Sequence, residues 1–491
     1  MSTDSSLKNK TVSSLLWKFG ERISAQLVSM IVSIVLARLL TPDDYGVVGI
    51  IAIFFAFANV LISGGFNAAL IQKKDANIED YSNVLFISLI SSTIVYLILF
   101  FCAPYLAHIY DKEILVPVIR VMGITLFISA FKSVLCAYIS SRLQFKKFFL
   151  STIVGTIISA VVGIVMAAKG YGCWALVGQQ MTNVLIDTLV LYFSTRVRFV
   201  FKFTPRKAKG LFRYGWKILV ASEISVLYEE INPLIIGVKF SAANLAFYAK
   251  GKSFPNLINA SLADSLSAVL FPVMAKIQDD KEAVLRCTRN YMRLTSFVIF
   301  PAMIGFLAIA ENFVLILLTE KWLPTTIYIQ MFCIVYMFNI IQVGNLQVIR
   351  AIGRSDIILK LEIIKKSLYS IVILLFVFLT NDPVYLGLAC IVNTGLATVI
   401  NTYPNKKLIG YKYSMQLSDL IWNFLTAIAM GAVVWAIGLL GINLYLLLIL
   451  QVFTGVIVYT LLSLITKNPA MKYFISTIKS FFAKRRRADA C

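Results

Sequence analysis

Long apolar segments recur along the whole of this 491-residue chain, and they limit the possible folds more than any other feature. A helix needs about 20 apolar residues, at about 1.5 Å each, to cross roughly 30 Å of hydrocarbon. Hydrophobic residues make up 59% of the sequence and charged residues only 14%, which is far from the balance of a soluble domain. The sequence therefore predicts an all-α polytopic membrane protein.

Fourteen segments are apolar and long enough to be predicted as transmembrane helices. The first is too long for the apolar part of a signal peptide and lacks a small-residue cleavage site, so we expect it to remain in the mature chain. The approximate limits of the fourteen are residues 12–38, 46–71, 82–106, 114–138, 148–168, 174–193, 214–238, 244–275, 290–318, 325–349, 357–380, 384–404, 416–440 and 442–466.

The basic residues between these helices lie almost entirely at one end of them. Taken alternately from the N-terminus, the connecting segments hold 31 lysines and arginines, whereas the other set holds only Lys112, Lys169, Lys239 and Lys321. Lys and Arg accumulate in the short cytoplasmic loops of membrane proteins. Both termini are therefore predicted to be cytoplasmic, and topology explains the net charge of +22 better than nucleic-acid binding does.

Two pairs of matching features lie about 200 residues apart and indicate an internal repeat. Trp17 and Trp216 open the first and seventh helices at an offset of 199, and Thr41 and Ser241 precede the second and eighth at an offset of 200. Thr41 and Ser241 are predicted N-caps, because a hydroxyl oxygen can accept a hydrogen bond from the first turn of a helix. Six helices per repeat keep both halves in the same membrane orientation. The sequence therefore predicts two parallel six-helix bundles followed by two C-terminal helices.

This repeat sets the predicted domain boundaries. The C-terminal tail is basic and its apolar residues follow helical spacing, so we expect an amphipathic helix resting on anionic headgroups. The predicted domains are an N-terminal six-helix lobe at 1–193, a basic cytoplasmic connector at 194–213, a C-terminal six-helix lobe at 214–404, transmembrane helices 13 and 14 at 405–466, and the tail at 467–491.

Charged residues inside the predicted helices are the candidates for function. A charge at mid-bilayer costs about 2.5–3.5 kcal/mol on insertion scales, so such residues are expected to face the bundle interior or a watery cavity. Lysine and arginine side chains bind phosphate and diphosphate groups through charge-assisted hydrogen bonds. The sequence therefore predicts a cationic cavity that binds an anionic headgroup. Carboxylates beside it would limit repulsion or carry a coupling ion. The predicted substrate-binding residues are Arg22, Lys250, Lys252 and Arg120, and the predicted coupling or charge-balancing residues are Glu21, Glu223, Glu230 and Asp264.

A second interpretation of these charges stays open. Long cationic side chains near helix ends can extend to the headgroups, and carboxylates can merely neutralise neighbouring cations. The residues to which this interpretation also applies are Arg22, Arg120, Lys132, Asp187, Glu229, Lys250, Lys252 and Arg293.

Residues for catalysis or metal binding are scarce. His108 is the only histidine, and the seven cysteines stand singly. We therefore predict no catalytic residues, no metal site and no cofactor, with Na⁺ or H⁺ left open as a coupling ion. The predicted external loops are short, which argues against a membrane glycosyltransferase or polysaccharide polymerase. A cation-coupled multidrug exporter stays open because Glu223, Glu229 and Glu230 would suit an acidic pocket.

Six motifs resemble those of one transporter family, and the resemblance extends from about residue 10 to residue 466. They are "SIVLARLLTPDDYGVVGI", "SGGFNAALIQKK", "LAFYAKGKSFPNLI", "LFPVMAKIQDD", "EKWLP" and "GRSDIILKLEIIKK". The sequence resembles the polysaccharide transport family, the Wzx-type oligosaccharide-lipid flippases. This family belongs to the multidrug/oligosaccharidyl-lipid/polysaccharide exporter superfamily.

The resemblance implies a function. Members of the family move an undecaprenyl-diphosphate-linked oligosaccharide from the cytoplasmic to the outer leaflet of the bacterial inner membrane, for O-antigen, capsule or exopolysaccharide assembly. It also implies a cationic central cavity with alternating access, into which Arg22, Lys250 and Lys252 fit by position. The implied partners are the lipid-linked oligosaccharide, membrane lipids and polysaccharide polymerase and assembly proteins, and no nucleic acid.

Overall fold

The structure, a computed structural model, describes residues 24, 26–63, 65–67, 70, 76–142, 144–200, 203–468 and 470–471. For residues 206–209, 211–214, 261–269, 271–273 and 355 it describes the helix but not the side chains. Within these ranges the regular structure is helical and contains no strand, which confirms the predicted all-α fold. The chain divides into two compact units, Met1–Ala246 and Phe247–Cys491.

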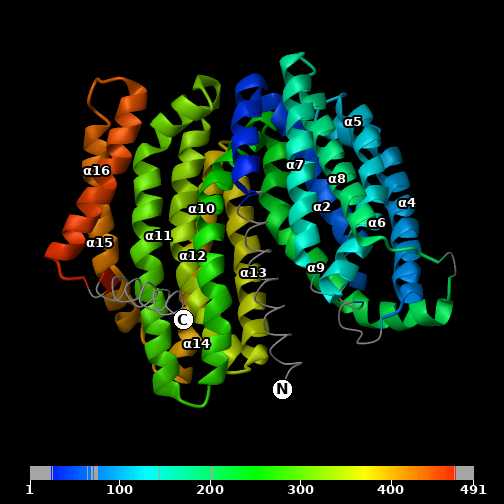
Figure 1. The fold of residues 1–491 in the computed structure, drawn as a ribbon. Helices are drawn as coiled ribbons and strands as arrows, with labels where there is room; N and C mark the ends of the chain where they lie inside the picture. The colour runs from blue at the N-terminus through cyan, green and yellow to red at the C-terminus, as the bar shows by residue number, and fades with distance from the viewer. Residues whose placement is uncertain are drawn as a thin grey trace, which may run out of the picture. The chain divides into compact units, whose positions relative to one another are not determined.

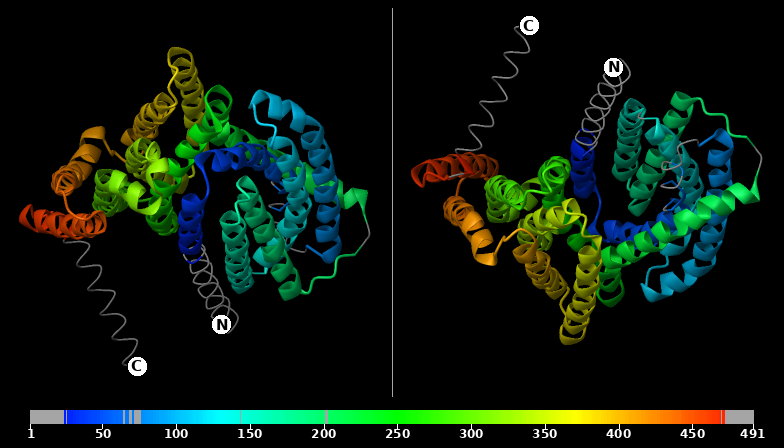
Figure 2. Two further views of the ribbon diagram at one scale, coloured as in Figure 1. Left: turned by 90° about the horizontal axis from the view of Figure 1, so that it is seen from above. Right: turned by 90° about the horizontal axis from the view of Figure 1, so that it is seen from below.

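The first unit is built from long helices joined by short connections (Figure 1). α7 and α8 lie side by side along their length, and α9 runs along α2 (Figure 2). The helices of this unit are Gln26–Leu39, α2 (Pro42–Ser63), α4 (Ile78–Ile109), α5 (Leu115–Met122), α6 (Ile124–Ser141), α7 (Phe145–Ala168), α8 (Cys173–Thr195), α9 (Pro205–Lys239) and the start of α10 (Ala242–Lys276).

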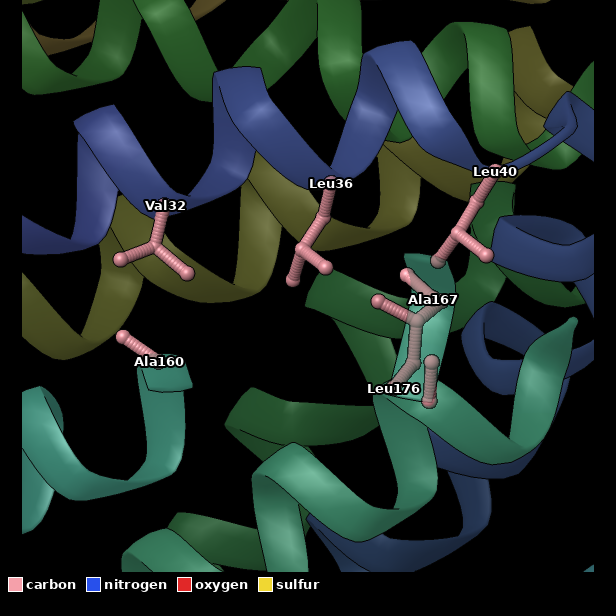
Figure 3. Close-up of a cluster of buried hydrophobic side chains, with 7 residues drawn as sticks. Val32, Leu36, Leu40, Ala160, Ala167 and Leu176 are labelled. Atoms are coloured by element: carbon pink, nitrogen blue, oxygen red, sulfur yellow. The ribbon is translucent and has the colours of Figure 1, made fainter. Parts of the chain in front are cut away.

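The first helix packs on α7 and α8 through one apolar face. Val32, Leu36 and Leu40 are spaced four residues apart, which places them on the same side of a helix. Figure 3 shows these three side chains directed toward Ala160 and Leu176 of the neighbouring helices. Leu36 is fully buried and Leu40 is 2% exposed. This packing fixes the end of the first helix at the point where the chain turns into α2.

The two predicted N-caps are confirmed. The backbone N–H of Asp44 donates to Thr41 Oγ1 at 3.2 Å, and the backbone N–H of Thr41 donates to the Asp44 carboxylate at 2.9 Å. At the start of α10 the backbone N–H of Asn244 donates to Ser241 Oγ at 3.1 Å. α2 and α10, which start 200 residues apart, therefore begin with the same N-capping hydrogen bond, as the repeat predicted.

Two glycines let α2 and its end approach neighbouring backbone closely. A Cβ atom at Gly46 would lie 2.0 Å from the carbonyl oxygen of Ala242. A Cβ atom at Gly65 would lie 2.1 Å from the carbonyl oxygen of Gly215 in α9. Any side chain at either position would overlap backbone, so glycine is required at both contacts.

The segment after α8 is tied to α4 before α9 begins. The backbone N–H of Val200 donates to Ser82 Oγ at 3.0 Å, and that of Thr204 donates to Asn83 Oδ1 at 2.6 Å. Phe199 also packs edge-on against Phe131 of α6 at 5.5 Å between ring centroids. The described part of the predicted connector is therefore held on the first unit.

In the second unit α11 packs against α12, α15 and α16, and α14 packs between α12 and α13 (Figure 1). The helices that follow α10 are α11 (Lys281–Leu317), the 3₁₀ turn η1 (Glu320–Trp322), α12 (Thr325–Ala351), α13 (Ser355–Leu379), α14 (Val384–Leu408), α15 (Tyr413–Ile437) and α16 (Leu444–Ile465).

A buried layer of amide side chains joins α12, α14 and α15. Asn345 and Gln416 exchange two hydrogen bonds at 3.0 and 3.1 Å, and Asn405 donates to Asn345 Oδ1 at 2.7 Å. All three side chains are buried. Buried polar networks of this kind fix the register of packed helices, because a slip would break these hydrogen bonds in a dry interior.

Nine helical spans in the described part of the chain are long and apolar enough to cross a membrane: α2, α4, α5 with α6, α7, α11, α12, α14, α15 and α16. The remaining predicted spans fall on Gln26–Leu39, α8, α9, α10 and α13, which are shorter or more polar. The total of fourteen crossings stays a prediction. The more polar helices include α9 and α10, which carry most of the predicted site residues.

Candidate functional site

Lys250 on α10 is buried in an aromatic environment within the second unit. Its residue is 8% exposed, and its Nζ atom lies 5.9 Å from the centroid of the Trp322 ring in η1. Trp322 is itself fully buried. A cation over an indole ring is stabilised by the electrons of the ring face. α10 therefore places the Lys250 ammonium group next to η1, which connects α11 and α12.

The helix approaches α12 closely at the next residue. A Cβ atom at Gly251 would lie 2.3 Å from the Cβ of Tyr328, so only glycine permits this contact. Tyr248 also packs edge-on against Tyr328 and Phe332, at 5.7 and 5.2 Å between ring centroids. These contacts fix the rotation of α10 and hence the direction of Lys250.

Lys252 lies two residues further along α10 and is half-buried. Residues two apart on a helix do not share a face. The two lysines therefore have different surroundings: Lys250 is enclosed in the second unit, and Lys252 retains an accessible surface.

Arg120 on α5 is half-buried in the first unit and stacks on an aromatic ring. Its guanidinium carbon lies 4.2 Å from the centroid of the Phe100 ring on α4. Its Nε atom is buried without a hydrogen-bond partner among the described residues. This arginine is held by the ring face, as Lys250 is held by Trp322.

Lys132 on α6 and Asp187 on α8 form an ion pair in the first unit. Lys132 Nζ lies 2.5 Å from Asp187 Oδ2, and the Asp187 side chain is only 8% exposed. A Cβ atom at Gly155 of α7 would lie 3.2 Å from the Asp187 Cβ, so the neighbouring helix closes over the pair. The second interpretation, in which a carboxylate neutralises a nearby cation, is confirmed for these two residues.

A larger ionic cluster connects α11 and α15 in the second unit. Arg289 donates to the two carboxylate oxygens of Asp419 at 2.8 and 2.9 Å, and Arg293 donates to Oδ1 at 2.8 and 2.5 Å. The Tyr411 hydroxyl donates to Oδ2 at 2.8 Å. Burial raises the pKa of Tyr411, and the adjacent Asp419 carboxylate raises it further, so the hydroxyl keeps its proton. No pattern in the sequence linked Asp419 to these arginines, although the two arginines are one helical turn apart.

The acidic side chains of α9 differ in their burial. Glu223 is half-buried, and its Oε1 atom is buried without a hydrogen-bond partner among the described residues. Glu230 is also half-buried, whereas Glu229 is exposed. Glu223 and Glu230 are seven residues apart, so they lie on the same face of the helix.

Three predicted site residues cannot be placed. Arg22 and Glu21 lie outside the described residues. Asp264 lies in α10, where the structure describes the helix but not this side chain. The predicted tail helix is likewise described only as far as Met471. Among the residues that the structure describes, no three His, Cys, Asp or Glu side chains gather as they would around a metal ion.

An apolar groove of about 480 Å³ lies among α10, α11, α15 and α16 in the second unit. Gly305 and Gly455 line it and place no side chain in the groove. Its size falls within the range of roughly 300–1,000 Å³ typical of ligand pockets. Other lining residues are Ile258, Phe297, Pro301, Phe306, Val456 and Tyr459. Sequence periodicity did not reveal this groove, because it forms only where four helices meet.

The fold and its buried charges define a polytopic α-helical membrane protein. The family described as polysaccharide biosynthesis protein matches residues 35–327, and the chain belongs to this family.

Relatives from three bacteria resemble the chain at low identity. It is 23% identical over 291 residues to the succinoglycan biosynthesis transport protein ExoT of Rhizobium meliloti, which covers 59% of this chain and 58% of that protein. It is 23% identical to the teichuronic acid biosynthesis protein TuaB of Bacillus subtilis, over 78% of this chain and 80% of that protein. It is 22% identical to the lipopolysaccharide biosynthesis protein WzxC of Escherichia coli, over 88% of this chain and 89% of that protein.

Solved structures share the fold. The lipid II flippase MurJ superposes with a TM-score of 0.75 and 13% identity, over 92% of this chain and 98% of that chain. A multidrug resistance transporter of the MATE family superposes with a TM-score of 0.58 and 15% identity, over 78% of this chain and 95% of that chain. The chain therefore shares its fold with both of these proteins.

Proposed function

We propose that this protein is a flippase that moves a lipid-linked oligosaccharide from the cytoplasmic to the outer leaflet of a bacterial inner membrane. The observation that carries the proposal is the family match over residues 35–327. The relatives ExoT, TuaB and WzxC are named for three different surface polysaccharides. A step that different glycans share is transport of the assembled unit across the membrane, which is why we propose transport and not glycosyl transfer.

The physical problem that such a protein solves is the passage of a polar headgroup through hydrocarbon. Each unpaired polar group costs several kcal/mol there, so a sugar diphosphate does not cross unaided. We propose that the apolar groove of the second unit holds part of the lipid chain, because its walls are almost entirely hydrocarbon. Gly305 and Gly455 line this groove without a side chain that would contact the lipid.

The cationic residues are proposed to attract the diphosphate. Lys252 retains an accessible surface, so its ammonium group can reach a ligand, while Lys250 adds positive charge from within the second unit. Arg22 and Arg120 are proposed for the same role from the first unit. Glu223 and Glu230 are proposed to balance this charge or to carry a coupling cation. Negative charge that moves outward in a membrane negative inside gains about 2.3 kcal/mol per charge per 100 mV.

Deletion of the gene followed by lipid analysis tests the proposal. We expect the deletion strain to lose surface glycan and to accumulate completed lipid-linked repeat units on the cytoplasmic leaflet. A strain that lacks a polymerase would instead export single units, and one that lacks a transferase would contain incomplete units. Either of those two results, with full restoration by the wild-type gene, would contradict the proposal.

The Lys252 assignment has its own test. We expect Lys252→Ala to lower glycan export at matched protein levels, because a charge-assisted contact to phosphate is lost. Lys252→Arg serves as the control and should retain most of the export, since it keeps the charge. Equal export by both variants and the wild type would remove Lys252 from the proposed site.

A cation-coupled exporter of small amphiphiles is the second candidate. The buried Oε1 atom of Glu223 favours it, because a carboxylate in an apolar helix can hold a coupling cation. Drug susceptibility separates the two candidates. An exporter mutant would become drug-sensitive while its surface glycan stays normal.

A further inference from the structure

A small polar hollow of about 150 Å³ lies beside the ionic cluster of α11 and α15. Its walls belong to the second unit and combine charged, amide, hydroxyl and indole groups. Its polar and aromatic lining residues are Arg293, Ser418, Asp419, Trp422, Asn423 and Asn468.

The charges at this hollow do not balance. Asp419 is fully enclosed, and its two oxygens accept five hydrogen bonds from Arg289, Arg293 and Tyr411. One carboxylate therefore faces two guanidinium groups, which leaves one surplus positive charge. The Arg289 and Arg293 side chains are 31% and 33% exposed, and their Nη1 groups take no part in these bonds. Donors and positive charge thus remain for a further anion.

The amide groups of the wall are already used and hold it in place. Asn423 donates to the Arg293 carbonyl oxygen at 2.9 Å and to Ser296 Oγ at 2.7 Å. Asn468 donates to Asn423 Oδ1 at 2.7 Å. These bonds fix the wall, so the hollow is a formed site whose remaining donors are guanidinium and hydroxyl groups.

The predicted spans place the hollow at the depth of lipid headgroups. Arg293 and Asp419 each lie about one helical turn inside the spans predicted at 290–318 and 416–440. Trp422 also lines the hollow and is 57% exposed, as expected of a tryptophan at a membrane interface. Ser418 is exposed at its edge.

We propose that this hollow binds the phosphodiester headgroup of an anionic phospholipid. Arg293 donates to the phosphate oxygens, Ser418 supplies a hydroxyl, and Trp422 packs beside the glycerol region. The hollow shares no lining residue with the apolar groove, and its proposed role does not depend on the proposed transport. Its chemistry selects phosphatidylglycerol over phosphatidylcholine, because only the former brings a net negative charge to the surplus arginine.

Native mass spectrometry of the purified full-length protein in detergent tests the site. The protein is titrated with dioleoyl phosphatidylglycerol, with dioleoyl phosphatidylcholine and with inorganic phosphate. Arg293→Gln removes the surplus charge and leaves Asp419 paired with Arg289. We expect it to weaken phosphatidylglycerol binding about tenfold or more, as for a lost charge-assisted hydrogen bond.

Two further variants make the test decisive. Ser418→Glu places a carboxylate at an exposed position of the hollow and should weaken binding as much as Arg293→Gln does. Arg286→Gln is the matched control, because Arg286 lies two turns away on α11 and pairs with Asp280 and Glu282 outside the hollow. We expect it to bind like the wild type.

Four outcomes would overturn the proposal. They are wild-type affinity in both Arg293→Gln and Ser418→Glu, an equal loss in Arg286→Gln, equal affinity of the wild type for phosphatidylcholine, and binding of inorganic phosphate without phosphatidylglycerol.

Discussion

Asp187 in the first unit and Asp419 in the second are both buried carboxylates in predicted transmembrane helices, yet their surroundings differ. Asp187 pairs with the single ammonium of Lys132, and its Oδ1 atom is buried without a hydrogen-bond partner among the described residues. Asp419 accepts five hydrogen bonds from two arginines and a tyrosine. The charge of Asp187 is neutralised, but one of its oxygens lacks a hydrogen bond. Both oxygens of Asp419 accept hydrogen bonds, and its two arginines together carry one positive charge more than it neutralises.

This difference follows from the chemistry of the cations. Lysine offers a compact point charge, whereas the planar guanidinium of arginine offers two parallel donors to a carboxylate. Arg289 and Arg293 are one turn apart on α11, so both reach the same acid on α15. We infer that the second unit uses its cluster to fix α15 on α11, while the pair in the first unit contributes less to stability.

Asp419→Ala should have the largest effect. It leaves two arginines partly buried without their carboxylate, and loss of one partner of a buried pair costs about 3–5 kcal/mol. The free energy of unfolding, measured by SDS titration in mixed micelles, should fall by about that amount. Tyr411→Phe is the control, because it removes one donor of five and should cost about 1 kcal/mol. Similar losses in the two variants would contradict the saturated cluster.

Lys132→Gln should have the next effect. It leaves Asp187 buried without its cation, and an unsatisfied buried acceptor costs about 1–3 kcal/mol. The same SDS titration measures it, and the double variant with Asp187→Asn should recover part of the loss, because no charge then remains buried. Additive losses in the double variant would show that the two residues do not interact in the native protein.

Arg293→Gln should cost less than Lys132→Gln, about 1 kcal/mol in the free energy of unfolding. The reason is that Asp419 keeps Arg289 and Tyr411, so its charge stays compensated. Two equal ion pairs would instead give equal losses of unfolding free energy in the two variants. A larger loss of unfolding free energy in Arg293→Gln than in Lys132→Gln would show that the fold requires both arginines beside Asp419.

Phe100→Leu should have the smallest effect, about 0.5–1 kcal/mol, and it tests a cation held without a carboxylate. The substitution keeps an apolar side chain but removes the ring face beneath Arg120. Comparison with Arg120→Leu and the double variant gives the coupling energy between the two side chains. A coupling energy near zero would show that the stacked geometry adds nothing to stability.

Several features of this protein were predictable because their causes are local. Apolar runs long enough to span a membrane predicted the all-α fold. Most helix boundaries lie within a few residues of the predicted ones, but α9 and α11 each begin nine residues earlier than predicted. The starts of α2 and α10 were predictable because a hydroxyl at Thr41 or Ser241 bonds to backbone only three residues away. The family was also recognisable from the sequence, because its motifs are contiguous in the chain.

The candidate site was predictable only in part, since charge alone does not say where a side chain points. Sequence placed Lys250 and Lys252 together, but α10 encloses Lys250 against Trp322, which lies 72 positions further along the chain. Gly251 decides this rotation, because only a glycine lets α10 approach Tyr328 so closely.

The amino-acid sequence by itself determined which segments form long apolar helices, how two of these helices begin and which family the chain belongs to, because hydropathy and capping act over a few residues. Only the tertiary structure decided which charges meet. Arg289 and Asp419 are separated by 130 residues, and the packing of α11 on α15 brings them within 2.8 Å. The physical reason is that a buried charge finds its partner through the packing of distant helices, which no local pattern specifies.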